Sequence, residues 1–295
     1  MSGYCYTRIE PETGLPWPCR YIVDEQGRDT GFGAIRGFLG GKALEFFEEW
    51  KVGRPLVGWA HFGTFPMPSE VYGGLNGTNW RYETDQCDLW CHCFREPDRF
   101  LPPGVPRLLL SGSDFVDTDR LAPLVGTPKR YDLLYSCLDN WFNAYQKNLD
   151  LYRRCLGVLD RNFDHLTVKF TGRPQVPWSQ HMRMIAASRA VFIPSISDAS
   201  PRLITEALAL DVPVLVNRHI LGGWKYVNAE TGRFFTDETD VVESLVKLYE
   251  ADLHPRRWLV ENYGRPIAGW WLAQALRELG APDSLRFAEP ADALR

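Results

Sequence analysis

The sequence predicts an α/β fold with parallel sheets, and three observations support this prediction. The 295 residues are enough for two domains of ordinary size. From about residue 130 onward, apolar segments of strand length alternate with segments whose apolar residues recur every three or four positions. The apolar segments are short and uninterrupted, which is typical of parallel strands covered by helices on both faces. We therefore expect Rossmann-like α/β domains.

The first part of the chain, to about residue 125, is rich in Gly, Pro and aromatic residues. Its apolar clusters predict short buried strands at 54–62, 87–94 and 106–112, and a helix at 40–50. The Gly/Pro-rich stretch 63–80 is expected to be an open loop.

The second part is more regular. In chain order, the pattern predicts a strand at 130–138, a helix at 143–159, a strand at 165–172, a helix at 179–189, a strand at 190–195, a helix at 201–210, a strand at 212–217 and a helix at 240–251. Pro266 then marks the start of a last helix. We expect domains at 1–126 and 127–265, with 266–295 as a C-terminal helix that crosses back to the first domain.

Composition excludes several other classes of protein. Hydrophobic residues make up 45% and charged residues 24%, which are values for a folded globular protein rather than a disordered one. The formal net charge of −4 gives no support for a generally basic nucleic-acid-binding surface. The chain has seven scattered cysteines, no apolar leader and no apolar run of membrane-spanning length, so we expect a reduced, cytoplasmic protein without a membrane span.

The segment between the strand 190–195 and the next helix carries the polar residues of interest. Ligands of doubly wound sheets bind beyond the carboxyl ends of the strands. The helix is expected to begin near Ser200 and Pro201, and its free N–H groups and positive dipole end suit a phosphate. Arg202 adds a guanidinium group that can donate several hydrogen bonds.

Two carboxylates flank this turn. Glu206 lies one turn into the helix, four residues after Arg202, and can accept two hydrogen bonds from a ribose diol. Asp198 precedes the turn and can meet hydroxyl groups beyond the phosphates. The segment therefore predicts a holder for a polar group linked to a nucleotide.

These residues resemble the donor-binding signature of retaining glycosyltransferases with the GT-B fold, the group 1 family. The matching features are Pro194-Ser195, the pair Asp198-x7-Glu206, the Glu-Ala-Leu that begins at Glu206, and the strand 211–214. The chain departs from the family pattern in having Asp198 for Glu and Asp211 for Gly. The resemblance implies two Rossmann-like domains whose parallel sheets face each other across a cleft. It also implies transfer of a sugar from a nucleotide-sugar donor to a hydroxyl acceptor, with retention of anomeric configuration.

The resemblance also implies roles for individual residues. Glu206 would bind the ribose and Asp198 would face the transferred sugar. The diphosphate would meet the backbone of Ala199, Ser200, Pro201 and Arg202. Lys147 matches the diphosphate-binding Lys of the family, whereas no Arg fits before it, and Arg173 is a further candidate for donor binding.

In the first domain, the segment 88–97 resembles the family strand end that supplies a donor-contacting His. His92 is the candidate, with His61 as its rival, so the predicted catalytic residues are Asp198, His92 and Lys147. The Gly-rich segment 31–41 is expected to be a loop that faces the donor. No metal is expected, because a strand places His92 on the side opposite to its cysteine neighbours. No cofactor is expected beside the donor substrate, a UDP- or GDP-sugar.

Two other functions are compatible with the same pattern. The chain could be a non-catalytic nucleotide-sugar-binding subunit, or a nucleotide-sugar epimerase with the GT-B fold. The acceptor is left open among a glycan, a small molecule, a protein and a modified nucleic acid, and so is the oligomeric state.

Overall fold

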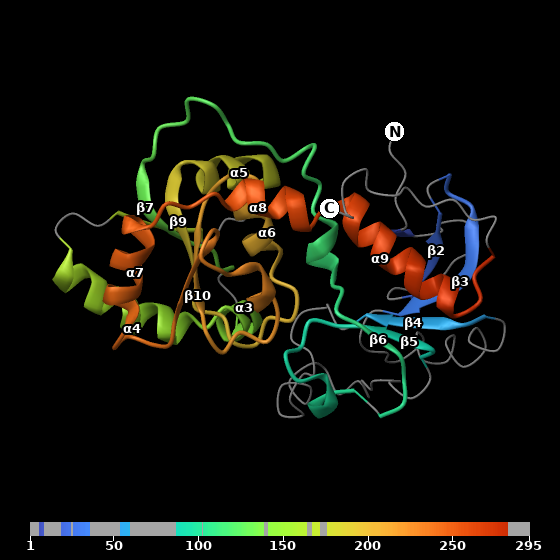
Figure 1. Ribbon diagram of the computed structural model, residues 1–295. Coiled ribbons are helices and arrows are strands. Elements are labelled where there is room, and N and C mark those ends of the chain that lie inside the picture. Colours follow the sequence, from blue (N-terminus) through green and yellow to red (C-terminus); the bar gives the residue numbers. More distant parts are fainter. Residues whose placement is uncertain are drawn as a thin grey trace. The chain divides into compact units, whose positions relative to one another are not determined.

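The computed structural model divides the chain into two compact units (Figure 1). The first unit comprises Met1–Phe115 and Arg265–Arg295, and the second comprises Val116–Gly264. The structure describes residues 6–8, 19–24, 26–35, 54–59, 87–101, 103–138, 141–163, 167–171 and 176–282.

The first unit contains a six-stranded sheet in the order β1-β2-β3-β4-β5-β6. The strands are β1 (Tyr6–Arg8), β2 (Cys19–Val23), β3 (Asp29–Ile35), β4 (Leu56–Trp59), β5 (Leu89–Cys91) and β6 (Arg107–Leu108). The strands β3 to β6 are parallel, whereas β1, β2 and β3 are paired antiparallel. The expected strands at β4, β5 and β6 are confirmed. The expected loop at 31–41 is wrong for 31–35, because these residues pair with β2 and β4; the rest of that segment and the expected helix 40–50 lie outside the described residues.

The core of the first unit includes the helix α9 (Arg265–Glu278). In the sequence, this helix begins more than 150 residues after the last strand of the sheet, β6. Its buried residues Ala268, Leu272, Ala273 and Leu276 recur at helical spacing and pack with apolar residues of the strands. Two short 3₁₀ turns, η4 (Pro97–Arg99) and η5 (Gly112–Phe115), complete the described elements of this unit. The helix predicted from Pro266 is thereby found.

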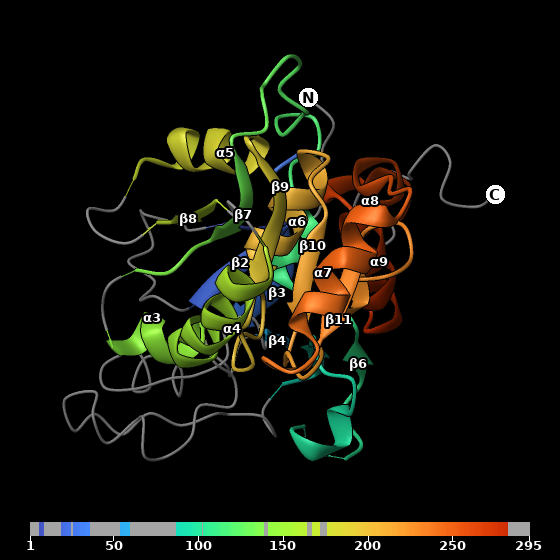
Figure 2. The same ribbon diagram turned by 90° about the vertical axis from the view of Figure 1, so that its left-hand side faces the viewer.

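The second unit contains a five-stranded parallel sheet in the order β8-β7-β9-β10-β11, and Figure 2 shows the strands in this order. The strands are β7 (Tyr131–Tyr135), β8 (Val168–Phe170), β9 (Ser188–Ile193), β10 (Val214–Asn217) and β11 (Gly232–Phe235). The helices are α3 (Trp141–Gln146), α4 (Leu149–Asn162), α5 (Trp178–Ala186), α6 (Arg202–Ala209), α7 (Val241–Glu250) and α8 (Pro255–Asn262), with a 3₁₀ turn η6 at Trp224–Tyr226. The predicted α/β fold with parallel sheets is confirmed.

Helices cover both faces of this sheet. Leu133 and Tyr135 of β7 belong to a core that includes residues of α4 and α7. Leu134 belongs to the opposite core, with residues of α5, α6 and α8. Because successive strand side chains point to opposite faces, a strand covered on both faces needs apolar residues throughout. This explains the uninterrupted apolar runs in the sequence.

The helix predicted at 143–159 is interrupted in the structure. Helix α3 ends at Gln146 and α4 begins at Leu149. Between them, Asn148 has a left-handed backbone with φ 52°. Asn is among the few residues other than Gly that tolerate this conformation. The break therefore turns the chain at one side of the carboxyl edge of the sheet.

Candidate functional site

The candidate site lies where the strand order of the second unit reverses. The strands β7 and β9 are neighbours, but the chain leaves β7 toward α4 on one face and leaves β9 toward α6 on the other. Such a divergence leaves space beyond the carboxyl ends of the two strands, where doubly wound proteins bind their ligands. The segment after β7 contributes Lys147, and the segment after β9 contributes Asp198.

Lys147 and Asp198 meet at this point. The Lys147 ammonium group forms a hydrogen-bonded ion pair with Asp198 Oδ2. The other carboxylate oxygen, Oδ1, accepts a hydrogen bond of 3.3 Å from the Ser200 backbone N–H. Asp198 is only 2% exposed, whereas the Lys147 side chain is 21% exposed. The site thus presents a cation to solvent and keeps its nearest carboxylate covered.

The backbone around Lys147 is fixed by two further bonds. The Tyr135 hydroxyl donates to the Lys147 carbonyl oxygen over 3.1 Å. The Asn148 side-chain amide donates to the Pro194 carbonyl oxygen over 3.2 Å, which ties the α3–α4 break to the end of β9. Lys147 is therefore held from both strands whose divergence creates the site.

A Gly-Gly turn supports the start of α6. The Gly222 N–H donates to the Asp198 carbonyl oxygen over 2.9 Å. Gly223 has φ +81°, and a Cβ atom there would lie 2.5 Å from Cγ of Pro201. Both the backbone angle and the close approach require Gly at this position. The turn therefore fixes where α6 begins.

Glu206 lies on α6 and is partly buried. Burial raises the pKa of its carboxyl, and three neighbours oppose this rise: the Trp178 indole N–H, Arg202 and Lys147. The Trp178 Nε1–H donates to Glu206 Oε1 over 3.3 Å. Within the described ranges, no ion pair joins Arg202 to Glu206, and Arg202 is exposed. The Glu206 carboxylate thus lies near the positive charges of Lys147 and Arg202 and is at the same time partly removed from solvent.

Trp178 was not among the residues expected from the sequence. It is the first residue of α5 and remains 44% exposed, and the Arg120 guanidinium lies 4.9 Å from the centre of its ring. A large aromatic side chain left in solvent beside a partly buried carboxylate suits ligand contact. The only sequence signal was its place after a strand, at the same carboxyl edge as Glu206.

The other residues predicted to bind the donor lie in the turn before α6, in the first unit or outside the described residues. In the turn before α6, Ala199 and Pro201 are buried and Ser200 is half-buried. His92 belongs to the first unit, where it is buried, accepts a 3.2 Å hydrogen bond from the Phe94 N–H at Nδ1 and stacks on that ring. Arg173, His61 and the loop 63–80 lie outside the described residues.

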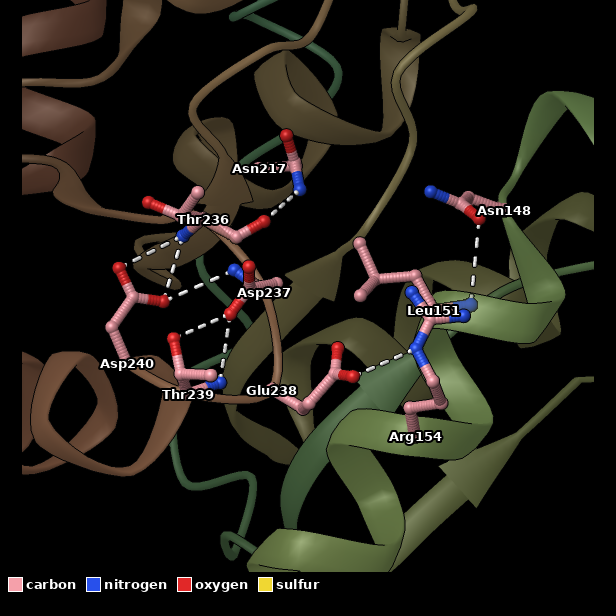
Figure 3. A network of polar contacts seen from close by, with 9 residues as sticks. All are labelled: Asn148, Leu151, Arg154, Asn217, Thr236, Asp237, Glu238, Thr239 and Asp240. Carbon is pink, nitrogen blue, oxygen red and sulfur yellow. Dashed lines mark hydrogen bonds and ion pairs between the residues drawn. The ribbon is translucent and has the colours of Figure 1, made fainter.

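A polar loop follows β11 and is held by a network of hydrogen bonds and one ion pair (Figure 3). Asp240 accepts hydrogen bonds from the backbone N–H groups of Thr236 and Asp237, and Glu238 forms a 3.0 Å ion pair with Arg154 of α4. The Asn217 amide, at the end of β10, donates to the Thr236 carbonyl oxygen over 2.8 Å. The Asp240 bonds therefore fix the shape of the loop, the Asn217 bond joins it to β10, and the ion pair joins it to α4.

Among the residues whose positions are described, no group of three or more His, Cys, Asp or Glu side chains could hold a metal ion. Cys87, Cys91 and Cys93 are buried. No described helix is both long and apolar enough to cross a bilayer.

Comparisons with known proteins identify the fold. No family model and no curated protein sequence matches the chain. Among solved structures, the pneumococcal O-GlcNAc transferase GtfA in complex with UDP and GlcNAc is 11% identical, with a TM-score of 0.57 over 80% of this chain and 55% of that one. AviGT4, a glycosyltransferase involved in avilamycin A biosynthesis, is 17% identical, with a TM-score of 0.50 over 78% of this chain and 70% of that one. A glycosyltransferase from Rickettsia africae ESF-5 is 11% identical, with a TM-score of 0.56 over 83% of this chain and 76% of that one.

The chain spans little more than half the length of GtfA. At these identities the likeness establishes the fold, which is that of the GT-B glycosyltransferases, and confirms the expected fold class.

Proposed function

We propose that this chain, which has the GT-B fold, is a glycosyltransferase that moves a sugar from a nucleotide-sugar donor to a hydroxyl acceptor with retention of configuration. The observation that carries the proposal is the meeting of Lys147, Asp198 and Glu206 around the point where the strand order reverses. A partly exposed cation beside a helix start suits a diphosphate, and a carboxylate one turn further on suits a ribose.

The proposed roles follow from these positions. Glu206 accepts hydrogen bonds from the ribose hydroxyls, with Trp178 holding one of its oxygens. The start of α6, Lys147 and Arg202 neutralise the diphosphate. Asp198, released as Lys147 turns to the phosphates, meets hydroxyls of the donor sugar.

In the proposed reaction, the bond between the sugar C1 and the β-phosphate oxygen breaks. The acceptor oxygen forms a new bond to C1 on the same face, and its proton passes to the departing phosphate. The negative charge that develops on that phosphate is the quantity that Lys147 and the helix start stabilise. His92 and Arg173 remain candidates for contact with the donor.

The test is a thermal-shift panel of UDP-, GDP-, ADP- and CMP-sugars, with the wild type beside Glu206→Gln. A ligand at about 100 times its dissociation constant stabilises the fold by about 2.7 kcal/mol. We expect one nucleotide to raise the melting temperature of the wild type, and this shift to be lost in the variant. Glu261→Gln, at an exposed position of α8, is the matched control and should keep the shift.

A transfer assay with the donor so identified tests the activity. No shift with any of the four nucleotides would contradict the proposal. Donor binding without transfer to glycan, protein, nucleic-acid or small-molecule hydroxyls would favour a non-catalytic subunit instead.

A further inference from the structure

A pocket lies in the same unit at the amino edge of the sheet, opposite to the candidate site. This amino-edge pocket has a volume of about 420 Å³ and lies between the segment 124–131 and the end of α5. Its lining consists of Leu124, Val125, Gly126, Thr127, Pro128, Arg130, Tyr131, Gln180, Arg183, Met184 and Ala187. The strand β7 begins at Tyr131, so the pocket is at the amino end of β7, whereas Lys147 follows its carboxyl end. It is therefore separate from the candidate donor site.

The segment that forms one wall of the pocket is well anchored. The Thr127 N–H donates to the Leu124 carbonyl oxygen over 3.1 Å, which closes a turn. The Lys129 ammonium donates to the carbonyl oxygens of Ala186 and Ser188, over 3.0 and 2.8 Å. Figures 1 and 2 both show this part of the chain, in green before β7, extending outward beyond α5. The turn is thus presented on a fixed support.

The tip of the turn is apolar. Val125 is fully exposed, and Leu124 is 44% exposed. Gly126 has φ +77°, the backbone angle that lets the turn close tightly behind Val125. Neither Val125 nor the exposed part of Leu124 contributes to the core, so the unit places two aliphatic side chains in water at the end of a supported projection.

The surface behind the tip is positively charged. Arg130 and Arg183 line the pocket and are exposed, and neither side chain forms an ion pair or a hydrogen bond with any residue that the structure describes. None of the residues that line the pocket is acidic. Two guanidinium groups without an internal partner are suited to a phosphate group.

We propose that this surface docks onto an anionic lipid bilayer, with Val125 and Leu124 entering the acyl region and the two arginines binding lipid phosphates. The apolar side chains lie at the tip of the projection and the arginines lie behind them, and this arrangement favours a bilayer over other partners. A membrane presents phosphates at its surface and hydrocarbon beneath them, which matches an apolar tip that projects past flanking cations. A free phosphate would engage Arg130 and Arg183 but would leave Val125 in water.

The test is flotation of the full chain with vesicles of phosphatidylcholine alone and with vesicles that also contain phosphatidylglycerol. We expect flotation only with the anionic vesicles, and weaker flotation as salt rises. Each charge near the bilayer contributes roughly fivefold to binding, so Arg130→Gln with Arg183→Gln should lower the vesicle affinity by at least tenfold. Val125→Ser should weaken binding at every salt concentration, because its contribution is apolar.

Matched controls make the result specific. Arg153→Gln with Arg161→Gln removes two exposed charges from α4, on the other face of the sheet, and Val260→Ser alters an exposed valine of α8. Both should float as the wild type does. The proposal fails if the chain floats with neither vesicle, if it floats equally with both, or if the controls lose as much as the pocket variants. Displacement by inorganic phosphate at matched ionic strength would instead assign the pocket to a soluble anion.

Discussion

The ion pair between Lys147 and Asp198 sets the charge of the candidate site before any ligand binds. Asp198 is buried and shares its carboxylate between the Lys147 ammonium and the Ser200 N–H. A buried carboxylate that loses its cationic partner is strongly destabilising, whereas a neutral group in its place is tolerated. We therefore expect Lys147 and Asp198 to be coupled in their contributions to stability.

This coupling gives a first prediction. Lys147→Met should lower the free energy of unfolding by about 2 kcal/mol, because it leaves Asp198 without its cation. In an Asp198→Asn background the same change should cost less than about 1 kcal/mol. Urea denaturation of the four proteins of this double-mutant cycle measures the difference. Equal costs in both backgrounds would show that the pair contributes nothing to the fold.

A second prediction concerns Glu206 and pH. Burial raises the pKa of Glu206 above its ordinary value of 4.5. Its contribution to stability is therefore fully present below pH 4.5 and is lost as the pH rises through the folded-state pKa. Glu206→Gln stays neutral at every pH, so it should melt at a higher temperature than the wild type at neutral pH, and this gap should close toward pH 4.5.

Melting curves across this pH range check the result, with Glu261→Gln as the control for loss of one negative charge. A gap of the same size at every pH would contradict a raised pKa. Glu206→Gln is thus expected to be more stable than the wild type at neutral pH and yet to lose nucleotide binding. Such a trade is common where a residue needed for binding lowers the stability of the fold.

Trp178 leads to a third prediction. Its indole N–H opposes the rise in the pKa of Glu206, so Trp178→Phe should raise that pKa further. Under the proposed function, the pH below which nucleotide affinity declines should then move upward in the variant. Calorimetric titration over a range of pH measures this shift. Trp271→Phe, at a half-exposed position of α9, is the control, and a loss of affinity by one constant factor at all pH values would indicate a merely structural role.

At the scale of elements, the break between α3 and α4 is what brings Lys147 to the end of β9. Asn148 adopts a left-handed backbone, caps α4 through a 3.4 Å bond from the Leu151 N–H, and bonds the Pro194 carbonyl oxygen. A continuous helix over the same residues could not turn at this point. The position of the catalytic candidate therefore depends on one residue outside any helix.

A fourth prediction separates the roles of Asn148. Asn148→Ala loses the cap and forces a Cβ-bearing residue without a polar side chain into the left-handed region, which should cost about 2–3 kcal/mol in unfolding free energy. Asn148→Gly keeps the backbone angle and should cost about 1 kcal/mol, for the lost hydrogen bonds. Chemical denaturation distinguishes the two. If the Gly variant were as unstable as the Ala variant, backbone strain would not be the cause.

At the scale of the whole molecule, two units with separate cores share one chain. The candidate site residues Lys147, Asp198 and Glu206 all belong to the second unit, whereas His92 belongs to the first. A nucleotide that binds as proposed should therefore stabilise the second unit directly.

The fifth prediction tests this division by hydrogen exchange. The nucleotide found in the thermal-shift panel should slow backbone exchange in peptides that cover 143–148 and 196–206. Exchange in α9 and in β3, whose residues belong to the first unit, should change much less. Mass spectrometry of the full chain, with and without the nucleotide, gives the measurement. Protection spread evenly over both units would contradict a donor site built by the second unit alone.

The sequence by itself predicted four of the five strands of the second unit, β7 to β10, and the carboxylates beside them. Strands covered on both faces require unbroken apolar runs, and Pro201 at a helix start requires a turn before it, so both can be recognised locally. For the same reason Asp198 and Glu206 were expected at the carboxyl edge. Lys147 was expected only from the resemblance to the GT-B family, and the structure places its ammonium group against Asp198.

The tertiary structure alone decided the features that depend on partners distant in sequence. The antiparallel pairing of β1, β2 and β3 and the contact of Trp178 with Glu206 join residues whose local patterns carry no sign of one another. The break at Asn148 is hidden because the apolar spacing of 143–159 continues across it. Hydrophobic periodicity records which side of an element is buried, whereas a hydrogen bond between two elements is specified only when the fold brings its donor and acceptor together.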